Sequence, residues 1–239
     1  MITERYNKLS DLPSSLPVFP LRGIIILPRT SLPFNIFEPR YLEMIDDVLA
    51  GERLIGLIQP DQRSRKSPDP VQDDEDDDNK IESPLDRSWP LRRAGCIARL
   101  TAFEEQDDGR LAITLTGIAR FNVVDEIDMS KPYRICNITS EPFKGDFNID
   151  EEEDQVDREK LLSLLRLYLN ANDMTADWRS IHRSSTNYLV NTLCIHSPYG
   201  AEEKQALLEA KTLKQRAEIL MALAEMELAS KNDGGGTLQ

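Results

Sequence analysis

The sequence predicts an α+β protein in which a β-rich N-terminal part precedes a bundle of helices. Short apolar runs punctuated by proline and glycine fill the first part of the chain, and an Asp-Gly turn at residues 108–109 joins two strand-like runs. Over the last third, apolar residues recur at helical spacing instead. At 239 residues, 40% of them hydrophobic, the chain is long enough for one large domain or two small ones.

The first third of the chain predicts strands and a single helix. Short apolar segments, separated by proline or glycine, are expected to form strands at residues 16–21, 24–27, 32–37 and 53–59. Pro39 suits the first position of a helix, because its missing N–H is not needed there. Apolar residues from Tyr41 to Leu49 follow at helical spacing, and Gly51 is expected to end the helix.

Residues 60–90 have a different composition. Five prolines bracket an acidic run at 73–78, and few apolar residues lie between them. Such a segment cannot bury enough apolar surface to become ordered, so it predicts a flexible acidic insertion inside the β-rich part.

The β pattern resumes after Gly95 and gives way to helices after residue 150. Strands are expected at 96–105, 110–116, 118–127 and 133–143, which favours a barrel or a sandwich. Helices are expected at 156–172, 178–195, 201–210 and from 213 to about 231. Two of these helices carry an apolar stripe, formed by Leu161, Leu164, Leu165 and Tyr168 and by Leu213, Ala217, Leu220 and Ala224. The glycine-rich end, residues 232–239, predicts a disordered tail.

The distribution of charge argues against two classes of protein. The formal net charge is −13, but the acidic runs at 73–78 and 150–154 hold eleven of the negative charges and leave −2 for the rest. A nucleic-acid binder needs a basic stripe, and the sequence has none. The longest aliphatic run, 24–27, is far too short to span a membrane, and residues 1–5 do not begin a secretory signal. A cytoplasmic location is therefore expected.

The sequence offers no recognisable catalytic, cofactor-binding or metal-ligating set. It lacks a phosphate-binding loop, a two-histidine zinc motif and a G-x-S-x-G elbow. Cys194 and His196 lie two residues apart on a predicted helix and therefore point to different faces, while His182 is expected on a polar face. Cys96, Cys136 and Cys194 are expected to be buried free thiols in a reduced compartment.

The acidic insertion also fails as a calcium-binding loop. Asp74, Asp76 and Asp78 have the right spacing for the first three ligands. However, Asn79 stands where the loop needs glycine, and Leu85 stands where it needs a bidentate glutamate. A solvated acidic tract is the simpler interpretation.

The densest constellation of aromatic and charged residues lies at the expected strand-to-helix junction, residues 32–41. The candidate peptide-binding or structural residues there are Phe34, Asn35, Phe37, Glu38, Arg40 and Tyr41. As a structural element, Glu38 could cap the helix that it begins, since a carboxylate suits the positive end of the helix dipole. As a functional element, the junction could line a groove. Both interpretations stay open.

These residues also carry a resemblance to a known family. The sequence resembles the N-terminal substrate-binding domain of the ATP-dependent protease Lon, and most of all the short bacterial proteins that consist of this domain alone. The matching segments are residues 16–22, 27–28, 32–42, 95–100, 108–110, 115–121 and 203–209, with Arg216. They extend over nearly the whole chain except the acidic insertion and the tail.

The resemblance implies a PUA-like β pseudo-barrel with one early helix at 1–145, which contains the insertion, and a helical subdomain at 146–231. It also implies recognition of unfolded or partly unfolded polypeptides, with Lon or another protease as a partner. The ATPase and Ser–Lys protease modules of Lon would follow this region, and the sequence holds no residues for them.

The sequence therefore favours a non-catalytic protein-binding module without a cofactor, which binds neither nucleic acid nor membranes. Two alternatives stay open. One is a hydrolase with an unrecognised site, since carboxylates such as Glu38, Glu104 and Glu105 are plentiful. The other is an RNA-binding module, because PUA-like folds in other families bind RNA.

Overall fold

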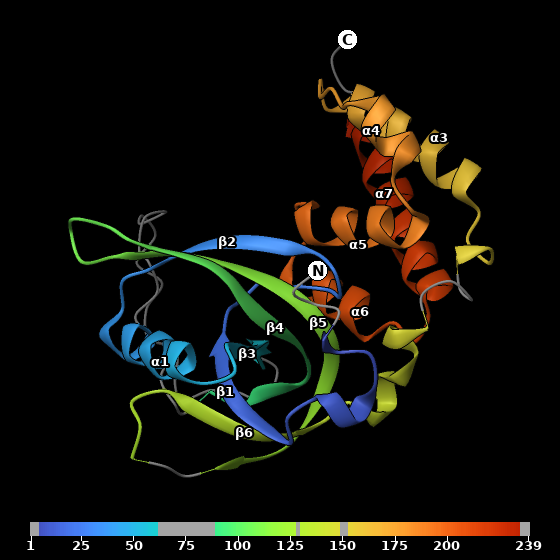
Figure 1. Ribbon diagram of the computed structural model, residues 1–239. Helices are drawn as coiled ribbons and strands as arrows, with labels where there is room; N and C mark the ends of the chain where they lie inside the picture. The colour runs from blue at the N-terminus through green and yellow to red at the C-terminus, as the bar shows by residue number, and fades with distance from the viewer. Residues whose placement is uncertain (1–4, 62–88, 128–129, 149–152, 235–239) are drawn as a thin grey trace, which may run out of the picture.

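The structure is a computed structural model that describes residues 5–61, 89–127, 130–148 and 153–234. In Figure 1 a curved β-sheet with one helix occupies the lower left, and the remaining helices form a second layer at the upper right. The elements in chain order are η2 (Leu9–Asp11), β1 (Ser15–Pro20), β2 (Ser31–Ile36), α1 (Pro39–Ala50), β3 (Leu54–Pro60), β4 (Leu91–Glu105), β5 (Leu111–Ile127), β6 (Arg134–Thr139), η4 (Glu141–Phe147), α3 (Arg158–Ala171), α4 (Trp178–Arg183), α5 (Thr186–His196), α6 (Ala201–Glu209) and α7 (Leu213–Gly234).

The six strands form one sheet that closes on itself. Their order is β2-β5-β4-β3-β1-β6, and β5 also pairs with β6, so that five strands make a ring. Only β1 and β3 run parallel; the other pairs are antiparallel. The long strand β5 makes the closure possible, because its first half pairs with β2 and its second half with β6. The predicted α+β class is confirmed, and of the two predicted β architectures the chain adopts the barrel.

The chain around Gly117 differs from the prediction in two ways. Residues 110–116 and 118–127 were expected as separate strands, but β5 is continuous, and a bulge at Ile118 absorbs the irregularity. The expected strand at 24–27 does not form. The carbonyl oxygen of Leu27 lies only 2.1 Å from the position that a Cβ atom on residue 117 would take, so this close approach requires glycine at 117. Leu27 instead exchanges hydrogen bonds with Thr30, so a local turn replaces a strand ladder.

The predicted hairpin is confirmed, and a second strand end is corrected. Gly109 has φ +80°, which the turn between β4 and β5 requires and which glycine adopts without strain. The strand predicted at 133–143 ends at Thr139, because the backbone leaves the extended conformation at Ser140 and η4 begins at Glu141, with Pro142 in its first turn.

The helix predicted at 178–195 is in fact two helices. Ser184 is extended, and the hydroxyl of Ser185 accepts a hydrogen bond from the N–H of Tyr188, so that a new helix begins there. The guanidinium of Arg158 fixes the break, because it donates to the carbonyls of Ile181 and Ser184. Helix α7 continues to Gly234, which is slightly beyond its predicted end.

Helix α6 joins the helical layer to the barrel through buried polar contacts. The Arg120 guanidinium forms an ion pair with Asp146, at 2.6 Å, and donates to the carbonyls of Leu208 and Ala210 at the end of α6. Gln59 of β3 donates to Gln205 of α6 at 3.0 Å. The hydrophobic core also continues from the barrel into the helices. The predicted boundary near residue 145 therefore crosses a shared core.

The acidic insertion lies almost wholly outside the described residues, as do part of the second acidic run and residues 235–239. The ends of the insertion are described. The N–H of Asp61 donates to the carbonyl of Pro90 at 2.7 Å, and Pro60 pairs with Leu91 as part of the β3–β4 ladder. The chain thus leaves and rejoins the barrel at neighbouring points. In the part of the chain that the structure describes, no helix is long and apolar enough to cross a membrane.

Candidate functional site

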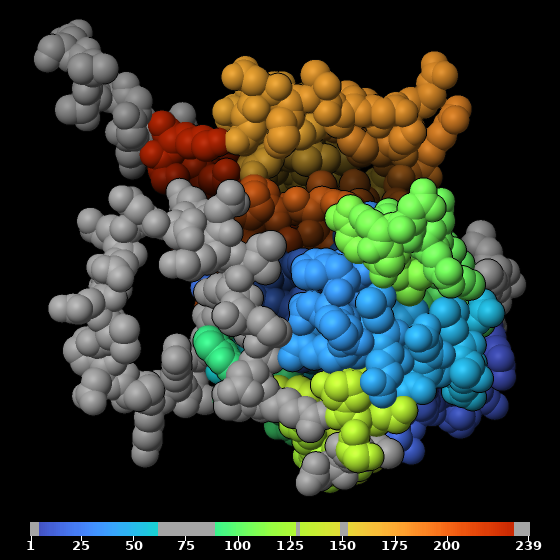
Figure 2. Space-filling model, turned by 90° about the vertical axis from the view of Figure 1, so that its left-hand side faces the viewer, coloured from blue at the N-terminus to red at the C-terminus, as the bar shows by residue number. Residues whose placement is uncertain are grey.

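The predicted junction is a surface where β2 meets α1. Phe34 is half-buried and packs edge-on against Phe19, with ring centroids 6.0 Å apart, while Asn35 is exposed. Phe37 is 53% exposed and is the large apolar side chain that this surface offers to a partner. Figure 2 shows the junction from outside, with β2 and α1 in blue beside the β4–β5 hairpin in green.

The charged pair of the junction is satisfied internally. The carboxylate of Glu38 lies 2.8 Å from the Arg40 guanidinium, which stacks 4.5 Å from the centre of the Tyr41 ring. Glu38 stands at the N-cap of α1, as the structural interpretation expects, but its side chain makes no capping hydrogen bond. The carboxylate pairs with the Arg40 guanidinium instead of with the N–H groups at the start of α1. Burial raises the pKa of Tyr41, whose side chain belongs to the core.

A larger and more apolar site lies in the helical layer. Helices α3 and α7, the end of α5 and the segment before α6 surround an open groove with a volume of about 440 Å³. We call it the α3–α7 groove. It is lined by Leu161, Leu164, Leu165, Tyr168, Leu169, Asn172, Met174, Leu193, His196, Ser197, Pro198, Tyr199, Leu220, Met221 and Ala224.

Local sequence features fix the walls of the α3–α7 groove. Asp157 caps the start of α3 by accepting a hydrogen bond from the N–H of Lys160, at 2.9 Å. The apolar stripe predicted on α3 then forms one wall, and Leu220 and Ala224 of the stripe predicted on α7 contribute to the other. The wall formed by residues 196–199 was not predicted. Pro198, which is unsuited to a helix interior, is the sequence signal for the break that creates it.

The lining of the α3–α7 groove contains few groups that carry charge. None of the lining residues that the structure describes is Asp, Glu, Lys or Arg. Burial raises the pKa values of Tyr168 and Tyr199, with a smaller contribution from nearby Glu227, so both phenols are uncharged at neutral pH. Charged groups nearby pair with one another, as Lys160 and Glu225 do at 3.1 Å. Apolar contact is therefore the main interaction that this groove can offer.

The described residues do not assemble an evident catalytic centre. No group of three or more His, Cys, Asp or Glu side chains among them could hold a metal ion. All three cysteines are free and buried, as predicted, and burial raises the pKa of Cys194 to about 12. Cys194 is buried while His196, two residues later on α5, is exposed, so they do not form a nucleophile–base pair. His182 is exposed on α4 beside Trp178.

The chain is similar to proteins of a known family. The family model for the ATP-dependent protease La (LON) substrate-binding domain matches residues 15–225. The chain is 27% identical over 229 residues to a Lon protease of Flavobacterium johnsoniae, and 29% identical over 227 residues to one of Parabacteroides distasonis. These alignments include 93% and 94% of the chain but only 26% and 25% of the relatives. The chain thus spans about a quarter of the length of these relatives.

Two solved structures share the fold. The Lon N-terminal domain protein from Xanthomonas campestris superposes with a TM-score of 0.58, and the N-terminal domain of the Mycobacterium avium complex Lon protease with 0.59. Each alignment includes 88% of this chain and 98% of the other, at 18% identity. Since the family model spans both the barrel and the helical layer, the chain belongs to the family of LON substrate-binding domains.

Proposed function

We propose that this protein binds unfolded polypeptide segments and that the α3–α7 groove holds their apolar side chains. The observation that carries the proposal is the groove itself, an open volume of about 440 Å³ walled by leucine, methionine and tyrosine. The family membership supports it, because the matching model describes the substrate-binding domain of a protease. The expected partners are unfolded or partly unfolded chains, and Lon or another protease could act with it.

The size of the α3–α7 groove suits a few apolar side chains. Binding pockets for small ligands typically measure about 300–1,000 Å³. Burying one large apolar side chain contributes about 1.5–3 kcal/mol, and association itself costs several kcal/mol. Two or three side chains would therefore give weak, reversible binding, which suits a module that must accept many sequences and then release them.

The chemistry of the lining predicts which segments bind. Because no described lining residue is Asp, Glu, Lys or Arg, the groove selects by apolar content rather than by charge. The two methionines of the lining, Met174 and Met221, adapt to side chains of different shape. We propose that the protein acts by binding alone, without cleaving its partners.

A matched pair of variants on α3 tests the proposal. Leu165 lines the groove and is half-buried, whereas Leu167 lies outside it and is 59% exposed. Binding of a dye-labelled peptide of alternating leucine and serine, the leucine probe, is measured by fluorescence anisotropy. Leu165→Glu should weaken binding about tenfold or more, because a carboxylate would enter the apolar groove. Leu167→Glu should leave binding unchanged.

Two further measurements complete the test. An all-serine peptide of the same length should not bind, and circular dichroism should show both variants to be folded. Equal binding of the leucine probe by wild type and Leu165→Glu, or no binding of this probe by the folded wild type, would overturn the proposal.

A further inference from the structure

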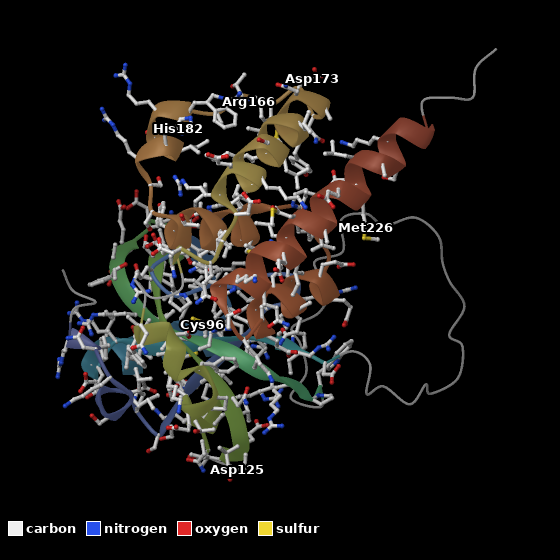
Figure 3. The ribbon with its side chains drawn as sticks, turned by 90° about the vertical axis from the view of Figure 1, so that its right-hand side faces the viewer. Cys96, Asp125, Arg166, Asp173, His182 and Met226 are labelled. Carbon is white, nitrogen blue, oxygen red and sulfur yellow. The ribbon has the colours of Figure 1, made fainter. Side chains whose placement is uncertain are left out.

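A left-handed turn at the end of α3 places Met174 in the wall of the α3–α7 groove. Asp173 has φ +51°, and the N–H of Met174 donates to the carbonyl of Leu169 at 2.9 Å. This bond across the last turn, after a residue in the left-handed region, is the Schellman pattern of helix ends. The pattern brings the residue after the turn against the last helical turn, and Met174 and Leu169 do line the groove together. Figure 3 labels Asp173 at this end of α3.

Among the described methionines, Met174 alone combines exposure with a place in the groove. It is 46% exposed, whereas Met44 and Met221 are buried. Met226 is more exposed, at 70%, but it lies on α7 outside the groove lining (Figure 3). Oxidants in solution therefore reach both Met174 and Met226. Of these two, only oxidation of Met174 would alter the groove.

Oxidation would convert the Met174 thioether into a sulfoxide. The sulfur attacks one oxygen of a peroxide, an S–O bond forms and the O–O bond breaks. The departing oxygen takes the proton of the transferred oxygen and leaves as water when the oxidant is hydrogen peroxide. Sulfur loses two electrons and the peroxide gains them. The product is a polar side chain in an otherwise apolar wall, and a polar group that loses water without gaining a partner opposes binding.

We propose that Met174 is a modification site at which peroxide oxidation switches off apolar binding in the α3–α7 groove. The proposal rests on the proposed function, whose site it regulates. The oxidant class is a peroxide, and the change is reversible in principle because methionine sulfoxide can be reduced enzymatically.

The test uses the full chain and the leucine probe. Affinity is measured before and after treatment with hydrogen peroxide, and mass spectrometry of proteolytic fragments measures the oxidised fraction of each methionine. We expect full oxidation of Met174 to weaken binding about tenfold, and the loss at partial oxidation to follow the oxidised fraction of Met174. Met174→Leu should make its binding of the leucine probe insensitive to peroxide, whatever its starting affinity. Met226→Leu, the matched control outside the groove lining, should bind like wild type and remain as sensitive to peroxide as wild type. Met174→Gln should bind weakly without peroxide, since its amide imitates the polarity of the sulfoxide.

The outcomes separate this proposal from the proposed function. Failure of the untreated protein to bind the leucine probe contradicts the proposed function. Normal binding by the untreated protein, followed by unchanged binding once Met174 is fully oxidised, overturns only the regulatory proposal. If peroxide still weakens binding in Met174→Leu, the regulatory proposal is overturned as well, because the responsible oxidation would then lie at another residue. Recovery of binding after treatment with a methionine sulfoxide reductase would support it.

Discussion

The strand-to-helix junction and the α3–α7 groove both bring apolar side chains to the surface, but they differ in what those side chains already contact. At the junction, Phe34 packs on Phe19, and Glu38 and Arg40 satisfy each other. Phe37 is left as a single projecting ring. In the groove, α3, α7, the end of α5 and a proline-containing segment surround an open volume. None of the described lining residues is Asp, Glu, Lys or Arg.

This difference shows that clustered aromatic and charged residues do not by themselves make a binding site. Such residues can bond to one another and leave little free energy for a partner. A concave apolar surface retains its capacity to bury a ligand, because its lining is still in contact with solvent. The four predictions below follow from this comparison, in order of decreasing expected effect.

The largest expected effect concerns the contact between the barrel, which carries the junction, and the helical layer, which carries the groove. Arg120→Met removes the partner of buried Asp146 and the donors to the end of α6. Loss of one member of a buried ion pair typically costs about 3–5 kcal/mol, so urea unfolding should show a loss of that order. Arg110→Met is the control, because the Arg110–Asp108 pair is exposed, and its unfolding midpoint should match wild type. Wild-type stability in Arg120→Met would show that the helical layer does not depend on this contact.

Filling the α3–α7 groove should separate binding from stability. Ala224 lines the groove from α7, and Ala224→Phe places a ring in the open volume. Affinity for the leucine probe should fall about tenfold, while thermal stability should stay constant or rise by up to about 1 kcal/mol. If stability falls and affinity is unchanged, the volume is not available to side chains of this size.

The corresponding change at the junction should have a smaller effect. Phe37→Ala removes the exposed ring, and we expect the affinity for the leucine probe to change by less than about twofold, within the range of peripheral interface contacts. Folding should be nearly unaffected, because most surface substitutions stay within about 0.5 kcal/mol. A large loss of affinity in anisotropy measurements would instead make the predicted junction the principal binding site.

The smallest effect is a dependence on pH at the other end of α1. Hydrogen bonds from Lys131 and Tyr133 hold the pKa of Asp47 below its usual value. A carboxyl with a lowered folded-state pKa stabilises the fold above its unfolded-state pKa of about 4, and this contribution disappears as pH falls through the folded-state value. Asp47→Asn should therefore lower the unfolding midpoint slightly at neutral pH, and the difference from wild type should vanish in acid.

The neighbouring residue supplies the control for this measurement. Asp46 is exposed on the same helix, and Asp46→Asn should show no comparable loss at neutral pH. A constant difference between wild type and Asp47→Asn from neutral to strongly acidic solution would contradict the role of the Asp47 carboxylate.

Local patterns in the sequence predicted most of the elements. Alternation and turn residues identified the strands and the Asp-Gly hairpin, and helical spacing identified α1, α3, α6 and α7. One of the wrong predictions has a tertiary cause. Residues 24–27 are apolar enough for a strand, but tertiary contact with Gly117 and a bond to Thr30 decide their conformation. Periodicity cannot detect such contacts.

The site was harder to predict than the fold. The stripes on α3 and α7 were visible as apolar patterns, and such a pattern shows which face a helix buries. It does not show whether two faces meet completely or leave a gap. The gap depends on the turn at Asp173 and on the segment around Pro198, whose paths follow from the whole structure. For the same reason, the pairing of Glu38 with Arg40 displaced the predicted cap.

The location of polypeptide binding is the central claim, and photo-cross-linking tests it most directly. A benzophenone amino acid is placed at position 165, 167 or 37 in separate proteins, and each is irradiated with an unfolded, carboxymethylated model protein. We predict strong cross-linking from position 165 in the α3–α7 groove and only background from positions 167 and 37. Strong cross-linking from position 37 with background from position 165 would contradict the account.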